Sequence, residues 1–157
     1  MSTTSATSTA TSHAGSPDRL RLDGKVVVLT GAAGILGSQV SARFLAQGAR
    51  VCALDVSDEA LARLPDGAQI LKVAVNIAER ASVEQAWQQL QATWGTPDVL
   101  MNNAATKSEN FFAPFEDFPL EDWNHVMSVN LTGAMLCAQV FGAPMAARGQ
   151  GAIVNTL

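Results

Sequence analysis

The amino-acid sequence predicts an α/β fold in which helices cover both faces of a parallel sheet. Short runs rich in β-branched residues alternate along the chain with segments whose apolar residues recur at helical spacing. Strands that alternate with helices form parallel sheets through right-handed crossovers. The chain has 157 residues, a length typical of one domain, and we place that domain at residues 23–157.

Residues 1–22 lack this pattern. They begin with a Ser/Thr/Ala-rich stretch that has no apolar periodicity, so we expect a disordered tail. The tail has neither the basic start nor the apolar centre of a secretory signal. We therefore expect a cytoplasmic protein.

At the start of the domain, the sequence predicts two strands joined by a helix. Residues 25–30 (KVVVLT) have the composition of a buried strand, and residues 50–55 (RVCALD) predict a second one. The helix between them ends near Gly48. Its expected core face consists of apolar residues at helical spacing: Leu36, Val40 and Phe44.

In the middle of the domain, the sequence predicts two more helices and two more strands. Ser57 is a candidate N-cap for a short helix. Residues 68–75 and 97–101 predict the third and fourth strands, and Gly95 ends the helix between them. The apolar face of that helix is spaced by four, three and four residues: Val83, Trp87, Leu90 and Trp94.

A loop at residues 106–119, a long helix at 120–148 and a buried strand at 152–156 complete the predicted order. We expect the phenylalanines of the loop (Phe111, Phe112, Phe115 and Phe118) to pack beneath it, and the alternative is that they contact a substrate. The long helix is apolar on nearly all sides, so a face that does not cover the sheet needs a following helix or a second subunit. A homo-oligomer formed through this helix is therefore one hypothesis. Its longest apolar stretch, residues 134–147, is too short to span a bilayer.

Composition argues against several other functions. The net charge is −4 and no basic cluster occurs, so a nucleic-acid partner is not expected. Cys52 and Cys137 lie far apart within apolar runs, which is typical of buried thiols and not of a disulfide framework. With only two histidines we expect no metal site.

The sequence TGAAGILG at residues 30–37 connects the first strand to the first helix, which is the context that a nucleotide-binding glycine motif requires. Gly31 permits a tight turn, Gly34 lets the backbone approach a pyrophosphate, and Gly37 lets helix and strand pack closely. The helix N-terminus offers free N–H groups and a partial positive charge to phosphates.

Asp55 ends the second strand, roughly 20 residues beyond the glycine motif, where a carboxylate accepts hydrogen bonds from the adenosine ribose. The same carboxylate repels a 2′-phosphate, and residues 30–37 contain no Arg or Lys. These features favour NAD over NADP. A surface Asp that caps the next helix is the simpler alternative.

Residues 102–105 (NNAA) follow the fourth strand, at the edge of a parallel sheet where ligands bind. Two asparagines and two small residues suit a bend that brings the backbone close to a ligand. An Asx-type turn without a ligand would have the same composition.

Together these segments resemble the N-terminal part of a classical short-chain dehydrogenase/reductase. The resemblance rests on TGAAGILG, Asp55, NNAA, WNHVMSVNLTG at 123–133 and GAIVN at 151–155. It implies a Rossmann-like, doubly wound parallel sheet, here of five strands and about four helices. It also implies NAD as cofactor and hydride transfer to or from a small-molecule alcohol or carbonyl substrate.

The resemblance assigns roles to individual residues. Asn76 and Ile77 would lie beside the adenine, and Asn130 is the catalytic residue that helps to hold a proton-relay water. The implied cofactor-binding residues are Thr30, Gly31, Ala33, Gly34, Ile35, Leu36, Gly37, Asp55, Asn76, Ile77, Asn102, Asn103 and Ala104.

Two departures from the family pattern limit the expected activity. The chain has no tyrosine, and none of its lysines fits the family's Tyr-x-x-x-Lys motif, so we expect a portion that stops before the catalytic Ser, Tyr and Lys and is inactive by itself. The spacing TGxxGxxG is that of the extended branch, which modifies sugar nucleotides. Alternatives are thus a fragment of an extended-type epimerase or dehydratase, or a non-catalytic dinucleotide-binding module.

Overall fold

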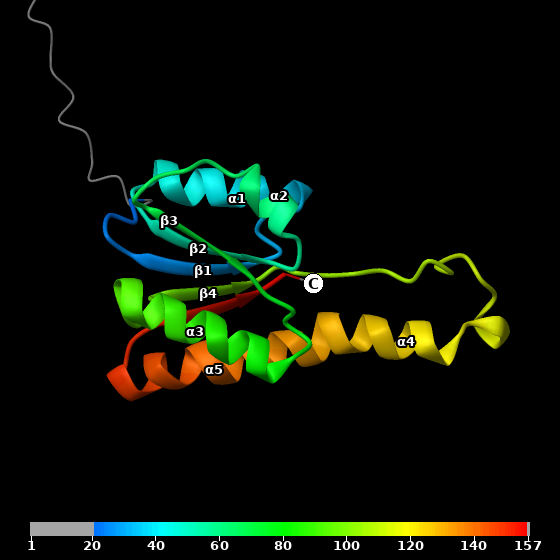
Figure 1. Ribbon diagram of the computed structural model, residues 1–157. Coiled ribbons are helices and arrows are strands. Elements are labelled where there is room, and N and C mark those ends of the chain that lie inside the picture. Colours follow the sequence, from blue (N-terminus) through cyan, green and yellow to red (C-terminus); the bar gives the residue numbers. More distant parts are fainter. Residues whose placement is uncertain (1–20, 157) are drawn as a thin grey trace, which may run out of the picture.

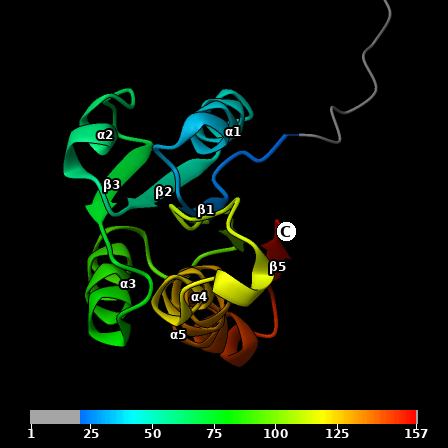
Figure 2. The same cartoon turned by 90° about the vertical axis from the view of Figure 1, so that its right-hand side faces the viewer.

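A computed structural model describes residues 21–156, and it confirms the predicted α/β class. Five parallel strands form one sheet in the order β3-β2-β1-β4-β5, between two layers of helices (Figures 1 and 2). Most of the tail predicted at residues 1–22 lies outside the described residues. The strands are β1 (Val26–Thr30), β2 (Arg50–Asp55), β3 (Ile70–Ala74), β4 (Val99–Asn102) and β5 (Ala152–Asn155).

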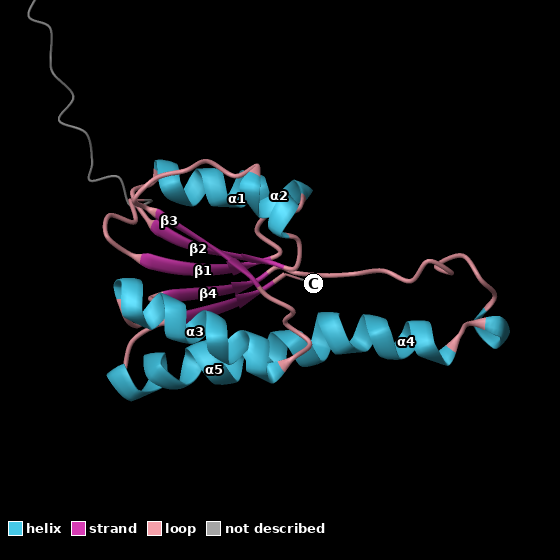
Figure 3. Ribbon diagram, in the orientation of Figure 1, coloured by secondary structure: helices cyan, strands magenta, loops and turns pink. Residues whose placement is uncertain are grey.

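The helices divide between the two faces of the sheet (Figure 3). The helices α1 and α2 lie on one face, and α3, α4 and α5 lie on the other (Figure 2). Ser57 caps α2 as predicted, since its Oγ accepts a hydrogen bond from the Ala60 N–H at 3.1 Å. The bounds are α1 (Ile35–Ala46), α2 (Asp58–Ala62), α3 (Arg80–Trp94), α4 (Leu120–Met127) and α5 (Ala134–Arg148), with a 3-10 turn η1 (Phe115–Asp117) and a π segment η2 (Ser128–Gly133).

Each face of the sheet has its own hydrophobic core, because successive strand residues point to opposite sides. Leu29 and Val51 belong to the core under α1 and α2. Val28 and Leu54 belong to the larger core under α3 and α5, where Phe141 is fully buried.

Both cysteines are buried in the larger core, as their apolar surroundings predicted. Burial raises the pKa of the Cys52 thiol to about 12, and it raises the pKa of the Cys137 thiol to about 12 as well. Thiols with such pKa values remain protonated at neutral pH and behave as small apolar groups.

Two predictions about buried residues are wrong. Leu36 is exposed, because α1 begins at the carboxyl edge of the sheet and its first turn extends past the strands. Gly37 and Ser41 are the residues of α1 that are buried. All four residues of β5 are exposed, because β5 lies at the sheet edge.

The prediction for the phenylalanines of the loop at residues 106–119 is also wrong for three of the four, whereas Phe118 is half-buried. Phe111, Phe112 and Phe115 are exposed, and Phe112 is 95% exposed. The loop extends away from the sheet, alongside α4, so no core lies beneath it (Figure 1). Phe111 and Phe112 contact each other edge to face, with ring centroids 5.2 Å apart.

The long helix predicted at residues 120–148 consists of α4, η2 and α5 in direct succession. Its second half packs on the sheet, whereas α4 extends beyond the carboxyl ends of the strands (Figure 1). By length and composition the helix could cross a membrane. Core helices of soluble proteins pass the same test, and Cys137, Phe141 and Met145 are buried here, so this is weak evidence for a span.

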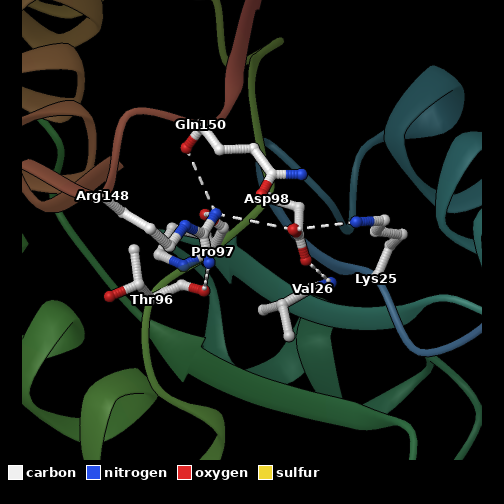
Figure 4. Close-up of polar contacts among 7 residues, drawn as sticks. All are labelled: Lys25, Val26, Thr96, Pro97, Asp98, Arg148 and Gln150. Carbon is white, nitrogen blue, oxygen red and sulfur yellow. Dashed lines mark hydrogen bonds and ion pairs between the residues drawn. The ribbon is translucent and has the colours of Figure 1, made fainter. Parts of the chain in front are cut away.

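At the amino edge of the sheet, Asp98 connects three segments (Figure 4). Its carboxylate accepts hydrogen bonds from the Val26 N–H at 2.9 Å and from Lys25 Nζ at 3.2 Å. Arg148, at the end of α5, lies 3.5 Å from the same carboxylate and donates to the Pro97 carbonyl at 2.8 Å. This cluster fixes α5 against the starts of β1 and β4, at the edge opposite to the candidate site.

Candidate functional site

A cavity of about 730 Å³ lies at the carboxyl ends of the parallel strands, where ligands bind in open α/β sheets. It is bordered by the glycine turn, by the ends of β2 and β3, by the segment after β4 and by one side of the long helix. The lining residues are Gly31, Gly34, Ile35, Leu36, Gly37, Leu54, Asp55, Val56, Val75, Asn76, Ile77, Asn103, Ala104, Ala105, Thr106, His125, Val129 and Thr156.

The three glycines of the turn have different reasons to lack a side chain. Gly31 has a φ of +62°, and a Cβ there would lie 2.8 Å from the Ala104 Cα. A Cβ on Gly37 would lie 1.9 Å from the Gly31 carbonyl oxygen. The protein itself therefore requires glycine at both positions.

Gly34 is different, because the folded chain leaves room for a side chain there. A Cβ on Gly34 would meet only the Gly31 carbonyl oxygen, at an ordinary 3.4 Å, and its φ of −69° suits any residue. Gly34 is the N-cap of α1 and borders the cavity. The open space in front of it suits a group that must approach the backbone closely, such as a phosphate at a helix N-terminus.

Asp55 is held in a fixed orientation at the end of β2. Its Oδ2 accepts a hydrogen bond from the Ala33 N–H at 3.0 Å, and its Oδ1 accepts one from the Ser57 N–H at 3.2 Å. The residue is half-buried and lines the cavity. The carboxylate thus joins the glycine turn to the start of α2 and brings a negative charge to the cavity wall.

The segment after β4 is tied to the glycine turn by backbone and side-chain hydrogen bonds. The Thr30 hydroxyl accepts from the N–H groups of Asn103 and Ala104, each at 3.0 Å. The Asn103 Nδ2 donates to the carbonyls of Thr30 and Gly31, at 3.1 and 3.3 Å. These bonds hold the segment after β4 beside the glycine turn, and Asn103, Ala104 and Gly31 all line the cavity.

The Asn102 amide bonds to groups on β5 and α5. Its Nδ2 donates to Asn155 Oδ1 at 2.9 Å and to the Ala134 carbonyl at 3.3 Å. Its Oδ1 is buried and has no hydrogen-bond partner within residues 21–156. Asn102 is therefore placed to hold β5 and α5 together next to the cavity.

Asn76 and Ile77 form the wall beyond β3. The Asn76 Oδ1 accepts from the Ala78 N–H at 3.1 Å, and its Nδ2 donates to Glu79 at 2.7 Å. Ile77 is buried and contacts the long helix at Gly133, where a Cβ would lie 2.7 Å from the Ile77 side chain. Both residues line the cavity next to Asp55.

Asn130 lies in the π segment, and its side chain joins the long helix to the segment after β4 by hydrogen bonds. Its Oδ1 accepts from the Thr106 N–H at 2.8 Å, and its Nδ2 donates to the Thr106 carbonyl at 3.0 Å. The amide thus satisfies both backbone groups of one residue. π segments are common at functional sites because they reposition backbone groups.

The structure brings most of the predicted site residues together around one cavity. Four predicted residues do not line the cavity: Thr30, Ala33, Asn102 and Asn130. Their hydrogen bonds connect the segments that form the cavity walls. Sequence reasoning missed other lining residues, including His125, Val129 and Thr156. The i, i+4 spacing of His125 and Val129 indicates a shared helix face, but spacing alone does not show what that face contacts.

The fold and the cavity define a Rossmann-like α/β domain with a glycine turn at the carboxyl edge of its sheet. A sequence model of the short chain dehydrogenase family matches residues 25–157. The chain belongs to this family.

Individual relatives agree with this assignment. The D-threitol dehydrogenase of Mycolicibacterium smegmatis is 36% identical over 140 residues, which are 86% of this chain and 53% of that protein. The structure of NAD⁺-bound xylitol dehydrogenase aligns with a TM-score of 0.79 at 28% identity, over 85% of this chain and 52% of the other.

A third relative was also solved with a cofactor. The structure of a 3-ketoacyl-(acyl-carrier-protein) reductase from Brucella melitensis complexed with NADH aligns with a TM-score of 0.77 at 28% identity, over 85% of this chain and 57% of that one. The chain thus spans about half the length of the relatives that it matches.

Proposed function

We propose that this chain is the NAD-binding portion of a short-chain dehydrogenase/reductase that transfers hydride between a nicotinamide cofactor and an alcohol or carbonyl substrate. The proposal rests mainly on the placement of Asp55, whose carboxylate borders the same cavity as Gly34 and the N-terminus of α1. A pyrophosphate at the helix N-terminus would leave the adenosine ribose within reach of that carboxylate.

The other lining residues suit the remaining parts of a dinucleotide. Asn76 and Ile77 would border the adenine, since they lie next to Asp55 at the end of β3. Ala104 would face the nicotinamide half, because its small side chain leaves space beside the glycine turn. The 2′-phosphate of NADP would lie next to the Asp55 carboxylate, and the two negative charges would repel each other. NAD is therefore the expected cofactor.

The redox chemistry needs a proton acceptor in addition to the cofactor. When an alcohol is oxidised, its carbinol C–H bond breaks and the hydride passes to the nicotinamide, while the hydroxyl proton leaves to a base. The chain contains no tyrosine that could act as this base with a lysine beside it. We therefore expect the 157 residues to bind NAD without oxidising alcohols, and the acid/base group to come from further residues of the longer protein.

The substitution Asp55→Asn tests the cofactor assignment. The amide oxygen of the new side chain can still accept the Ala33 N–H bond, but the charge that strengthens hydrogen bonds to the ribose is lost. Calorimetric titration should show NAD⁺ affinity about tenfold weaker, and a smaller preference over NADP⁺. Asp58→Asn, which changes an acid at the start of α2 that does not line the cavity, should leave both affinities unchanged. Equal NAD⁺ and NADP⁺ binding by the unaltered protein would contradict the proposal.

The substrate proposal draws on the relatives. Two of them are named as dehydrogenases of D-threitol and of xylitol, which supports a small hydroxylated substrate for the longer protein. Such a protein would act in the cytoplasm, where the cofactor is present, without a membrane or a nucleic acid as partner.

We also propose a homo-oligomer formed through the helix at 120–148. Large apolar side chains are exposed along it at Leu120, Trp123, Leu131 and Met135. An exposed apolar stripe of this kind marks an association surface. Sedimentation should show a dimer or larger species, and Leu131→Glu should shift it toward monomer because a charge would then be buried in the contact. A monomer at all concentrations of the unaltered protein would refute this.

A further inference from the structure

Residues 107–123 form an arm that carries the net negative charge of the chain. The arm contains one cation, Lys107, and five carboxylates: Glu109, Glu116, Asp117, Glu121 and Asp122. Its net charge is therefore −4, the same as that of the whole chain, because the remaining residues contain nine cations and nine carboxylates. The arm extends past the carboxyl ends of the strands (Figure 1).

The charge of the arm is not cancelled by pairing. Within residues 21–156 the ion pairs all join residues outside the arm. Four of the five acids are exposed, at positions 109, 116, 117 and 121. The Ser108 hydrogen bond, followed by that of Asn110, lowers the pKa of the fifth, Asp122, which therefore keeps its charge at neutral pH.

Both ends of the arm join the wall of the cavity. Thr106, directly before the arm, and His125, two residues after it, line the cavity. Glu121 and His125 are four residues apart on α4, so their Cβ atoms lie about 6 Å apart on one face of the helix. Asp122 accepts a hydrogen bond from the Ser108 hydroxyl, which holds the loop against α4. The charges of the arm thus lie beside the cavity and not on a remote surface.

The cavity itself offers no side-chain cation to a substrate. Its lining within the described part of the chain includes one carboxylate, Asp55, and no lysine or arginine. The N-terminus of α1 is the positive group at the cavity, and the proposed function assigns it to the cofactor phosphates. Charges within about 10 Å, the Debye length at 0.1 M salt, act on an ion that enters a cleft.

We infer that the arm makes the site selective for the charge of the substrate: it favours uncharged alcohols and carbonyls over those that carry a carboxylate or a phosphate. The inference rests on the proposed function, since it requires a substrate beside a nicotinamide in the cavity. An anionic substrate would approach against the charge of the arm and would meet no cation on the described wall. An uncharged substrate meets neither obstacle. The arm thus influences which substrates enter without taking part in hydride transfer.

The test compares methyl acetoacetate with acetoacetate, which share one ketone and differ by one negative charge. The complete polypeptide encoded by the gene that contains this sequence is assayed with saturating NADH, so that cofactor affinity does not enter. At low salt, kcat/KM for the ester should exceed that for the acid by at least about tenfold. At about 1 M salt, where the Debye length is about 3 Å, this ratio should become smaller because the charges are screened.

Glu109→Gln combined with Glu121→Gln removes two charges near the lining residues and keeps the shape of both side chains. At low salt, kcat/KM for acetoacetate should rise about fourfold, since one charge at about 10 Å in water changes it about twofold. The value for the ester should change little. Asp23→Asn combined with Asp66→Asn is the matched control, because it removes two exposed carboxylates from the opposite edge of the sheet. It should leave both values unchanged.

Four results would overturn the inference. They are equal kcat/KM for the ester and the acid, a ratio that salt does not change, the same response to both double substitutions, and a protein that binds NADH but reduces neither ketone. The salt dependence is measured on the unaltered protein, so it decides the question even if a variant does not fold. A protein that does not bind NADH would instead refute the proposed function.

Discussion

Replacing Gly37 by alanine is expected to lower the free energy of unfolding by more than about 3 kcal/mol, or to prevent folding altogether. The added Cβ would lie 1.9 Å from the Gly31 carbonyl oxygen and 2.9 Å from the Ala32 Cα. Both are backbone atoms that cannot rotate away, so α1 would have to move off β1. Circular dichroism with urea titration measures the loss.

Gly34→Ala is the matched comparison, because it makes the same chemical change three residues earlier. The added Cβ would meet an ordinary contact of 3.4 Å, so stability should fall by less than about 1 kcal/mol, the cost of a poorer N-cap. NAD⁺ affinity should fall at least about tenfold, since the methyl group would occupy the space proposed for the pyrophosphate. Unchanged NAD⁺ binding by a folded Gly34→Ala protein would contradict the proposed cofactor site.

Phe141→Ala is expected to be the most destabilising change in the cores, at about 3–5 kcal/mol. Phe141 is fully buried between α5 and the sheet, and its ring meets Trp87 of α3 edge to face with centroids 6.2 Å apart. Truncation would leave a cavity and remove the contact that joins the two helices. The midpoint of urea unfolding should fall accordingly.

Phe112→Ala provides the control, because the same residue type is removed from an exposed position. Phe112 is 95% exposed, so its loss should change stability by no more than about 0.5 kcal/mol. A small effect at Phe141 would contradict its burial under α5, and a large effect at Phe112 would contradict the exposure of the loop.

The predictions that the structure confirms depend on local geometry. The buried residues of β1 and β2 are β-branched or apolar because helices cover both faces of the central strands. The alternation of strands and helices along the chain already implied a parallel sheet. Ser57 and Gly95 mark helix ends through the backbone geometry that they permit. The glycine turn is recognisable because the sequence shows both its spacing and its place between a strand and a helix.

The wrong predictions concern burial, which depends on distant parts of the chain. The fifth strand has the composition of a buried strand, but it lies at the sheet edge and is exposed. The composition of the loop at 106–119 predicts phenylalanines packed beneath it, but the loop extends past the sheet. Apolar composition shows that a residue favours burial, but not whether a neighbouring segment is there to cover it.

The sequence by itself determined the α/β class, the order of the elements, and a set of candidate cofactor residues between Thr30 and Ala104. Only the tertiary structure decided that Asn130 clamps Thr106, that Gly34 has open space where Gly37 has none, and that His125 borders the same cavity as Asp55. The physical reason is that the spacing of apolar residues along the chain follows the geometry of each single helix or strand. Contacts across the cavity depend on how strands and helices far apart in sequence pack together.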